Sequence, residues 1–138
     1  MSQPTIKTVS LIVRNLEKTM ADYSRLLGGG VGPFKNLDLE HMGIRGVLAP
    51  MGPLWLELLQ PIVQAHPLWK SLGEKDVCLR SLSFVVNDLD MEIARFRELG
   101  IHATKKQHDE GTDYVLLDTE KIAGITFQLC QVVGPGAI

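Results

Sequence analysis

Glu57 is the residue of this chain whose type and surroundings are best suited to chemistry. It lies in the run 54–59 (LWLELL), where strand alternation puts Glu57, Trp55 and Leu59 on one face. A carboxylate that loses water to apolar neighbours holds a proton more readily, which suits proton transfer near neutral pH. The alternative is a structural Glu57 that pairs with a basic group or points to solvent.

Arg45 and His41 form a second group of candidates. Arg45 lies in the run 42–47 (MGIRGV), and an even separation would place His41 on the same strand face. An arginine cannot act as a base at neutral pH, but its fork of donors can hold a carboxylate, phosphate or enolate oxygen. A histidine there could act as an acid or base. For both residues the alternative is a plain surface side chain.

Two aromatic residues could line a ligand pocket. Tyr114 opens a strand of the second half and could donate a hydrogen bond to a ligand oxygen. Trp55 could form part of an apolar wall, and a role in the core is the alternative for it. The sequence contains no nucleophile elbow, phosphate loop, dinucleotide fingerprint or Cys/His pair.

The chain that carries these residues repeats itself. A strand at 6–13 and a helix capped by Asn15 are followed, later in the chain, by a strand at 79–86 and a helix capped by Asp88. The segment VRNLEKTMADYSRLLG matches VNDLDMEIARFRELG, with Leu89 standing 73 positions after Leu16 (89 − 16). A repeat of this length indicates a duplicated half-domain.

Each predicted helix is followed by three further strands. They are expected at about 31–39, 41–49 and 54–60 in the first copy and at about 102–108, 113–118 and 125–132 in the second. We therefore predict an α+β fold in which two tandem β-α-β-β-β modules form a mostly antiparallel eight-stranded sheet. Residues 1–138 are expected to be one domain, with modules at about 5–61 and 79–133 and a linker at 62–78.

Composition excludes several functional classes. A net charge of −2 on 138 residues gives no reason to expect a nucleic-acid partner. No run is long enough for a membrane span, and the start of the chain lacks the pattern of a signal peptide. Cys78 and Cys130 form no metal-like pair, and Cys130 is expected to be a small buried hydrophobe. A cytoplasmic protein with reduced thiols is the simplest interpretation.

The order of these motifs resembles the vicinal oxygen chelate superfamily of glyoxalases, epimerases, extradiol dioxygenases and bleomycin-resistance proteins. The motifs are a strand, a helix that begins with N-L or D-L and ends with L-G, and the strand WLELLQP, with strand and helix repeated. The likeness covers nearly the whole chain, and the pattern is most similar to methylmalonyl-CoA epimerase-like and glyoxalase-like members. It implies a cupped sheet, a small-molecule ligand and a homodimer.

The resemblance also implies a divalent metal, held by His and by Glu or Gln on the first and last strands of each module. It assigns these positions to four residues of this chain: Thr8, Glu57, Ser81 and Gln128. Neutral hydroxyls and an amide are weak ligands, so we expect the metal site to be lost and no cofactor to be needed. Thr8, Ser81 and Gln128 then become candidate ligand-binding residues.

Three functions remain open from the sequence. The first is a metal-independent isomerase, epimerase or lyase in which Glu57 moves a proton while Arg45 or the polar groups at the ligand positions steady an enolate. The epimerases carry an acidic catalytic residue near the position of Arg45, and this departure argues against the epimerase reaction itself. The second is a protein that sequesters a drug or metabolite, as bleomycin-resistance members do. The third is a metal site rebuilt from other residues, such as His41 with Glu57.

Overall fold

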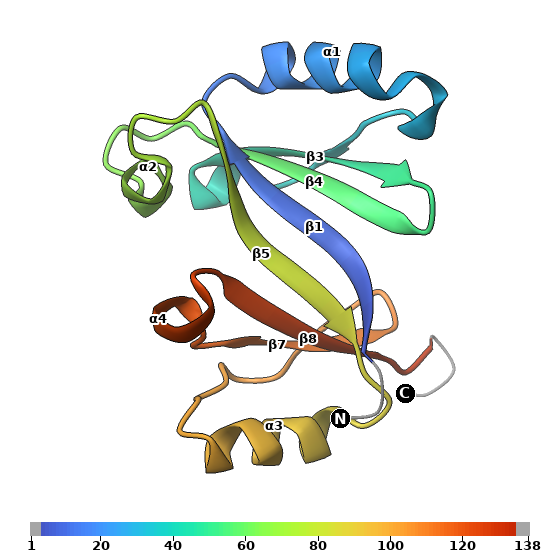
Figure 1. Cartoon of the computed structure of the whole chain (residues 1–138), viewed down its shortest axis with the longest axis vertical. Helices are drawn as coiled ribbons and strands as arrows, with labels where there is room; N and C mark the ends of the chain where they lie inside the picture. Colours follow the sequence, from blue (N-terminus) through green and yellow to red (C-terminus); the bar gives the residue numbers. More distant parts are fainter. Residues whose placement is uncertain (1–3, 135–138) are drawn as a thin grey trace. The chain divides into compact units, whose positions relative to one another are not determined.

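The computed structural model describes residues 4–134, which belong to two compact units (Figure 1). The first unit consists of residues 8–80, and the second contains residues 81–134 together with residues 4–7. The order strand, helix, strand, strand, strand occurs twice along the chain. The predicted α+β class and the eight strands are therefore confirmed. None of the helices within residues 4–134 is long and apolar enough to cross a membrane.

The first unit has the strand order β2-β3-β4-β1. β1 pairs with β4 in parallel, whereas β2–β3 and β3–β4 are antiparallel. The elements are β1 (Thr5–Val13), α1 (Leu16–Leu27), the 3-10 turn η1 (Gly28–Gly30), β2 (Lys35–Leu37), the 3-10 turn η2 (Glu40–Met42), β3 (Ile44–Met51), β4 (Leu54–Pro61) and α2 (Pro67–Leu72).

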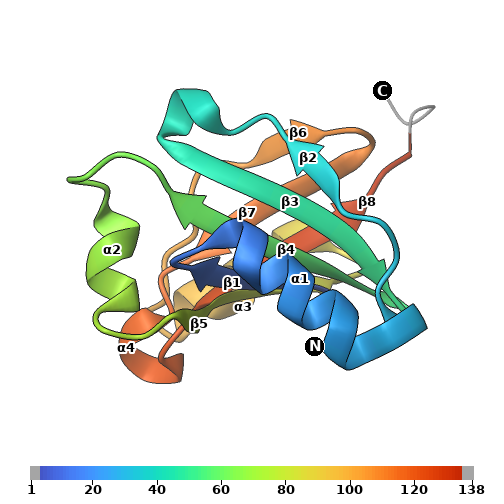
Figure 2. The same cartoon turned by 90° about the horizontal axis from the view of Figure 1, so that it is seen from above.

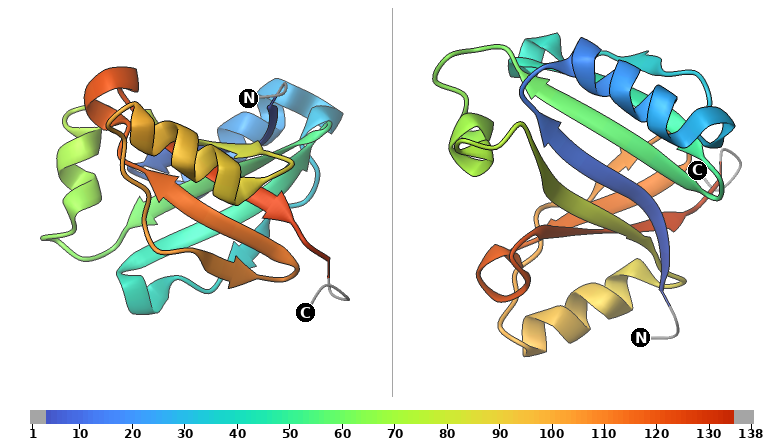
Figure 3. Two further views of the ribbon diagram at one scale, coloured as in Figure 1. Left: turned by 90° about the horizontal axis from the view of Figure 1, so that it is seen from below. Right: turned by 45° about the horizontal axis from the view of Figure 1, so that its top comes forward.

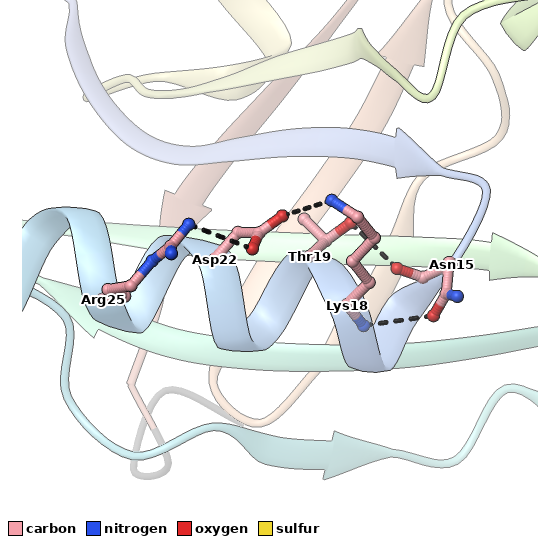
Figure 4. A network of polar contacts seen from close by, with 5 residues as sticks. All are labelled: Asn15, Lys18, Thr19, Asp22 and Arg25. Atoms are coloured by element: carbon pink, nitrogen blue, oxygen red, sulfur yellow. Dashed lines mark hydrogen bonds and ion pairs between the residues drawn. The ribbon is translucent and has the colours of Figure 1, made fainter.

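Helix α1 begins at a conventional cap and carries a polar outer face. The side chain of Asn15 accepts a hydrogen bond from the Lys18 amide at 3.1 Å, and the Thr19 hydroxyl donates to the Asn15 carbonyl at 2.9 Å (Figure 4). Lys18 and Arg25 both pair with Asp22, at 2.6 and 3.6 Å. These exposed pairs keep one side of the helix in water, so its other side is free to pack on the sheet.

Helix α1 lies over one face of the sheet of the first unit (Figure 2), and the core of this unit lies between the helix and that face. Leu56 and Leu58 of β4 point toward the helix, because alternate residues of a strand share a face. The fully buried members of this core are Val13, Leu16, Val47, Leu56 and Leu58. The opposite face of β4 therefore carries Glu57.

The second unit repeats this arrangement with the strand order β5-β8-β7-β6. β5 pairs with β8 in parallel, and the other two pairs are antiparallel. Helix α3 lies along β7 and β8 (Figure 3) and closes a core that includes Phe96, Val115 and Leu129. The elements are β5 (Val77–Val85), α3 (Leu89–Glu98), β6 (Gln107–Asp109), β7 (Thr112–Leu117), α4 (Glu120–Ala123) and β8 (Thr126–Val132).

A glutamine on the last strand of each unit caps the helix of that unit. The Oε1 atom of Gln60 on β4 accepts from the Leu16 amide at 2.7 Å, and that of Gln131 on β8 accepts from the Leu89 amide at 2.9 Å. Each bond gives a partner to an amide in the first turn of a helix, where no intrahelical acceptor exists. Strand and helix are thereby fixed to each other in the same way in both halves.

Several predicted strands are shorter than expected. The strand predicted at 31–39 is confined to β2, and the one predicted at 102–108 contributes only its end to β6. The strand predicted at 41–49 starts later, at Ile44, because Gly43 takes a positive φ of 74° that ends η2. Residues 62–78 contain the unpredicted helix α2, and a second unpredicted helix, α4, lies between β7 and β8.

The segment between the modules packs against the first unit. The Arg14 guanidinium donates to the carbonyls of Gly73 and Lys75 at 2.6 and 2.9 Å, and it lies 5.6 Å from the centre of the Trp69 ring.

Cys78 and Cys130 are both free thiols, and burial raises the pKa of the Cys130 thiol. Cys130 is 1% exposed, as expected for a small hydrophobe.

The capping role of Gln60 can be tested by stability measurements. We expect Gln60→Ala to lower the free energy of unfolding by about 1–2 kcal/mol, because a partly buried amide loses its acceptor. Gln131→Ala should cost a similar amount, whereas Gln64→Ala, at an exposed position in the same unit, should be neutral. Urea unfolding measures all three, and an unchanged midpoint for Gln60→Ala would contradict the capping role.

Candidate functional site

Glu57 lies on the face of the first sheet that α1 does not cover. It is half-buried, and Ser10 stands directly opposite it on β1 in the parallel register. The Ser10 hydroxyl donates a hydrogen bond to Oε1 of Glu57 at 2.7 Å. Within residues 4–134 no ion pair involves Glu57. Among the described residues, the carboxylate is therefore stabilised by a hydrogen bond from a neutral donor and by no cation. Its second oxygen, Oε2, can accept a hydrogen bond or a proton from a ligand.

Trp55 and Thr8 lie beside this pair. Trp55 is the Cα partner of Thr8, two residues before Glu57 on β4, so the two side chains share the face of Glu57. Trp55 is 39% exposed, and an indole of this kind offers a wide apolar surface next to the carboxylate. The structure thus brings Thr8, Trp55 and Glu57 together, as the sequence pattern predicts.

Ser10 is a site residue that the sequence analysis missed. The pattern Thr8-Val9-Ser10 recurs as Ser81-Leu82-Ser83, again 73 positions later (83 − 10). Alternation places Thr8 and Ser10 on one face, so a second hydroxyl at the same spacing in both copies was a usable signal. Ser10 is 2% exposed, and a buried hydroxyl needs a hydrogen-bond partner.

The same face continues across β3 to β2. Leu48 is the partner of Glu57 on β3, and Lys35 is the partner of Leu48 on β2. Directly opposite residues point to the same side of a sheet, so Lys35, Leu48, Glu57 and Ser10 form one row across the four strands. The row carries an ammonium group at one end and a hydroxyl-bound carboxylate at the other, with a leucine between them.

Arg45 does not join Glu57, contrary to the role predicted for it. It is the partner of Gln60 on β4, which places it on the face that α1 covers. Its guanidinium pairs with Oε1 of Glu17 on α1 at 2.6 Å, and this hydrogen bond holds the pKa of the Glu17 carboxyl below its ordinary value. Arg45 also lines a small cleft of about 170 Å³ with Asn36 and Glu40. Glu57 and Arg45 therefore lie on opposite faces of the first sheet.

His41 is likewise separated from the positions predicted for it. It is an exposed residue of the turn η2 and not part of a strand, so the even spacing from Arg45 does not give a shared face. The strand predicted at 41–49 runs through Gly43, whose left-handed conformation is incompatible with a strand.

The second unit brings its own predicted residues to one face. Gln128 on β8 is the partner of Ser83 on β5 and of Leu116 on β7, and Ser81 lies two residues before Ser83. Tyr114 lies two residues before Leu116, so it shares this face. The Tyr114 hydroxyl donates to Oε1 of Gln107 at 2.6 Å. These side chains are all neutral, whereas the corresponding face of the first unit carries the charged residues Glu57 and Lys35.

The residues at the positions that the resemblance gives to a divalent metal do not fit that ion. Of Thr8, Glu57, Ser81 and Gln128, only Glu57 offers a charged oxygen, and one of its two oxygens already accepts from Ser10. Divalent metals of this class favour imidazole, thiolate and carboxylate ligands. Within residues 4–134 there is no group of three or more His, Cys, Asp or Glu side chains placed to hold a metal.

Comparisons with known proteins agree on the fold. The sequence profile of the family described as Glyoxalase/Bleomycin resistance protein/Dioxygenase superfamily matches residues 8–115. No significant match is found among curated proteins. Among solved structures, a methylmalonyl-CoA epimerase in complex with methylmalonyl-CoA and NH4+ has a TM-score of 0.75 at 20% identity, covering 97% of this chain and 100% of its own.

A second similar structure is methylmalonyl-CoA epimerase from Mycobacterium tuberculosis. It has a TM-score of 0.73 at 18% identity and covers 91% of this chain and 86% of its own. A variant of the Streptomyces coelicolor methylmalonyl-CoA epimerase, in complex with 2-nitronate-propionyl-CoA, has a TM-score of 0.74 at 19% identity over 96% of this chain and 100% of its own. At these identities the likeness establishes the fold.

The bond between Ser10 and Glu57 can be measured with a double-mutant cycle. Ser10→Ala and Glu57→Leu, alone and combined, should show a coupling of about 1–2 kcal/mol in unfolding free energy, because the bond joins a hydroxyl to a partly buried charge. The matched control is the cycle of Ser83→Ala with Gln128→Leu, whose side chains share the register but no hydrogen bond in the described chain. Equal coupling energies in both cycles would contradict a stabilising hydrogen bond between Ser10 and Glu57.

Proposed function

We propose that this chain, which belongs to the glyoxalase/bleomycin resistance protein/dioxygenase superfamily, binds a small carbonyl compound and moves a proton next to its carbonyl or carboxylate group without a metal. Glu57 is the base in this proposal, and the face that carries Thr8, Ser10 and Trp55 is the binding surface. The reaction class is that of an isomerase, epimerase or lyase. The proposal includes the homodimer that the resemblance implies.

The state of the Glu57 carboxylate is the observation that carries the proposal. It is half-buried, has no cationic partner in the described chain, and accepts one hydrogen bond on Oε1. A structural glutamate in a sheet usually gains a cation or faces water, because a buried charge without compensation is costly. A carboxylate held by a single hydroxyl keeps one oxygen able to accept a proton.

The geometry allows a simple sequence of proton movements. Oε2 of Glu57 takes the acidic proton from the carbon beside the ligand carbonyl, so the C–H bond breaks and an O–H bond forms. The electron pair moves onto the carbonyl oxygen to give an enolate. The Thr8 hydroxyl, on the same face, can donate to that oxygen. Return of the proton to a neighbouring carbon completes an isomerisation, and protonation of the opposite face of the enolate by a second acid, such as water, completes an epimerisation. Expulsion of a neighbouring group with the electron pair of the enolate completes a lyase reaction.

The names of the similar structures suggest which ligands to examine first. The epimerases are described with methylmalonyl-CoA and with 2-nitronate-propionyl-CoA, which are an acyl thioester and the nitronate analogue of one. Carbon atoms next to a thioester carbonyl carry acidic protons, which is the chemistry that Glu57 could serve. Acyl thioesters and α-carbonyl acids are therefore the substrate classes of the proposal.

Sequestration of a small molecule is the second candidate function. It is favoured by the position of Arg45, which pairs with Glu17 on the helix-covered face and so supplies no cation next to Glu57. An enolate beside Glu57 then has the neutral side chains of Thr8, Ser10 and Trp55 as its neighbours and lacks stabilisation by an adjacent cation. Binding without turnover needs no such stabilisation.

The role of Glu57 as a base can be tested with Glu57→Gln. This change should lower the rate of proton–deuterium exchange into acyl thioesters or α-carbonyl acids by about 10²–10⁴-fold, because the amide cannot accept the proton. The amide keeps the size of the side chain and an acceptor for Ser10, so the melting temperature should change little. Exchange is followed by mass spectrometry or NMR.

The control for this experiment is Glu74→Gln, the same chemical change at an exposed position between α2 and β5. It should leave exchange and melting unchanged. Exchange that survives Glu57→Gln would refute Glu57 as the base. Ligand binding by a wild-type protein that shows no exchange with any candidate would instead support sequestration.

The proposed independence from metal has its own test. We expect purified protein, dialysed against buffer without chelator, to contain well below one divalent metal ion per chain, because one carboxylate among neutral donors binds such ions weakly. Elemental analysis measures this directly. About one zinc, nickel, iron or manganese ion per chain would contradict the proposal, as would exchange activity that is lost with EDTA and restored by one of these ions.

A further inference from the structure

We infer that Lys35 is the residue that selects an anionic ligand for the Glu57 face, by pairing with a carboxylate or phosphate of the molecule whose acidic carbon meets Glu57. The inference deepens the proposed function and rests on it, since the same ligand contacts both residues. Lys35 was not a candidate from the sequence, and the cation that was expected to act with Glu57, Arg45, lies on the opposite face of the sheet.

The strand register places Lys35 in line with the carboxylate. Lys35 on β2 is the partner of Leu48 on β3, and Leu48 is the partner of Glu57 on β4. Two strand spacings separate Lys35 from Glu57, or about 10 Å between backbones. A lysine stem of four carbons can lie along Leu48, so the ammonium group can stand at either end of that leucine.

Lys35 has no acidic partner among the described residues, a property that it shares with exposed lysines such as Lys70, Lys75 and Lys105, and its place on the face of Glu57 is what distinguishes it from them. Lys18 pairs with Asp22 and Lys106 with Asp90, both at 2.6 Å, whereas no ion pair within residues 4–134 involves Lys35. Lys35 is exposed, so its charge costs nothing in desolvation before a ligand arrives. The chain thus offers an unpaired ammonium group on the same face as an unpaired carboxylate.

The two charges together fix the direction of a ligand. An anionic group beside Glu57 would be repelled, and the same group beside Lys35 would be attracted. The row therefore favours a molecule with its anionic group over β2 and its acidic C–H group over β4. An apolar part of the molecule would lie on Leu48, between the two charged residues, and on Trp55, beside Glu57. A neutral ligand of the same shape would lack this orientation.

A set of four thioesters tests the inference. The same acyl chain, with or without a carboxylate, is attached either to coenzyme A, which carries phosphates, or to N-acetylcysteamine, which is uncharged. Lys35→Ala should raise KM for proton exchange by about three- to tenfold with the anionic compounds, as expected for loss of a partly exposed ion pair, and leave kcat nearly unchanged. The wholly neutral compound should be unaffected.

The pattern across the set identifies the group that Lys35 binds. A loss seen only with the coenzyme A esters assigns the phosphate, and a loss seen with the carboxylated N-acetylcysteamine ester assigns the carboxylate. The matched control is Lys70→Ala, which removes an exposed lysine of the same unit on α2. It should leave KM unchanged for all four compounds. Added salt should weaken binding of the anionic compounds to wild type and have little effect on binding to Lys35→Ala.

The outcomes also separate this inference from the proposed function. Equal effects of Lys35→Ala on charged and neutral compounds, or no effect on either, overturn the role of Lys35 while leaving Glu57 as the base. If no compound exchanges with wild type, equilibrium dissociation constants replace KM. A selective loss of affinity for anionic compounds then supports Lys35 although the proposed chemistry fails, and the absence of such a loss overturns it.

Discussion

The parallel pairing of β1 with β4 places Ser10 opposite Glu57, and the surroundings of the carboxylate follow from that register. A shift of one residue would turn every side chain of β4 to the other face. Leu56 and Leu58 would then leave the core, so their burial against α1 holds the register in place. The hydrogen bond of 2.7 Å between Ser10 and Glu57 thus depends on apolar packing on the opposite side of the sheet.

The spacing of the polar residues on β4 and β8 places a helix-capping residue on one face of each sheet and a different polar residue on the other face. Glu57 and Gln60 are three positions apart, so one points away from α1 and the other caps it. Gln128 and Gln131 have the same relation in the second unit. The capping glutamine is thus present in both copies, whereas the residue on the open face is charged in the first copy and neutral in the second. The two halves share a scaffold and differ in the chemistry they can support.

Periodicity alone predicted the duplication, the α+β class and the shared face of Glu57 and Trp55, because these depend on strand alternation and helix spacing. It could not place Arg45, since that requires knowing where β3 begins and which face α1 covers. The left-handed Gly43 shifted the start of β3, and with it the position of His41. The repeated hydroxyl pattern could have pointed to Ser10, but its pairing with Glu57, like the position of Lys35, depends on cross-strand registers that join residues 47 and 13 positions apart in the sequence (57 − 10 and 48 − 35).

The proposed chemistry requires that Oε2 of Glu57 contact the ligand. The most direct measurement is carbon-13 NMR of protein labelled at the glutamate carboxyl carbon, with the Glu57 signal identified by its loss in Glu57→Gln. Addition of an acyl thioester or α-carbonyl acid that binds should move the Glu57 signal and leave those of exposed carboxylates such as Glu74 in place. A Glu57 signal that stays unchanged at ligand saturation would show that the carboxylate does not contact the ligand and would contradict its proposed role as the base.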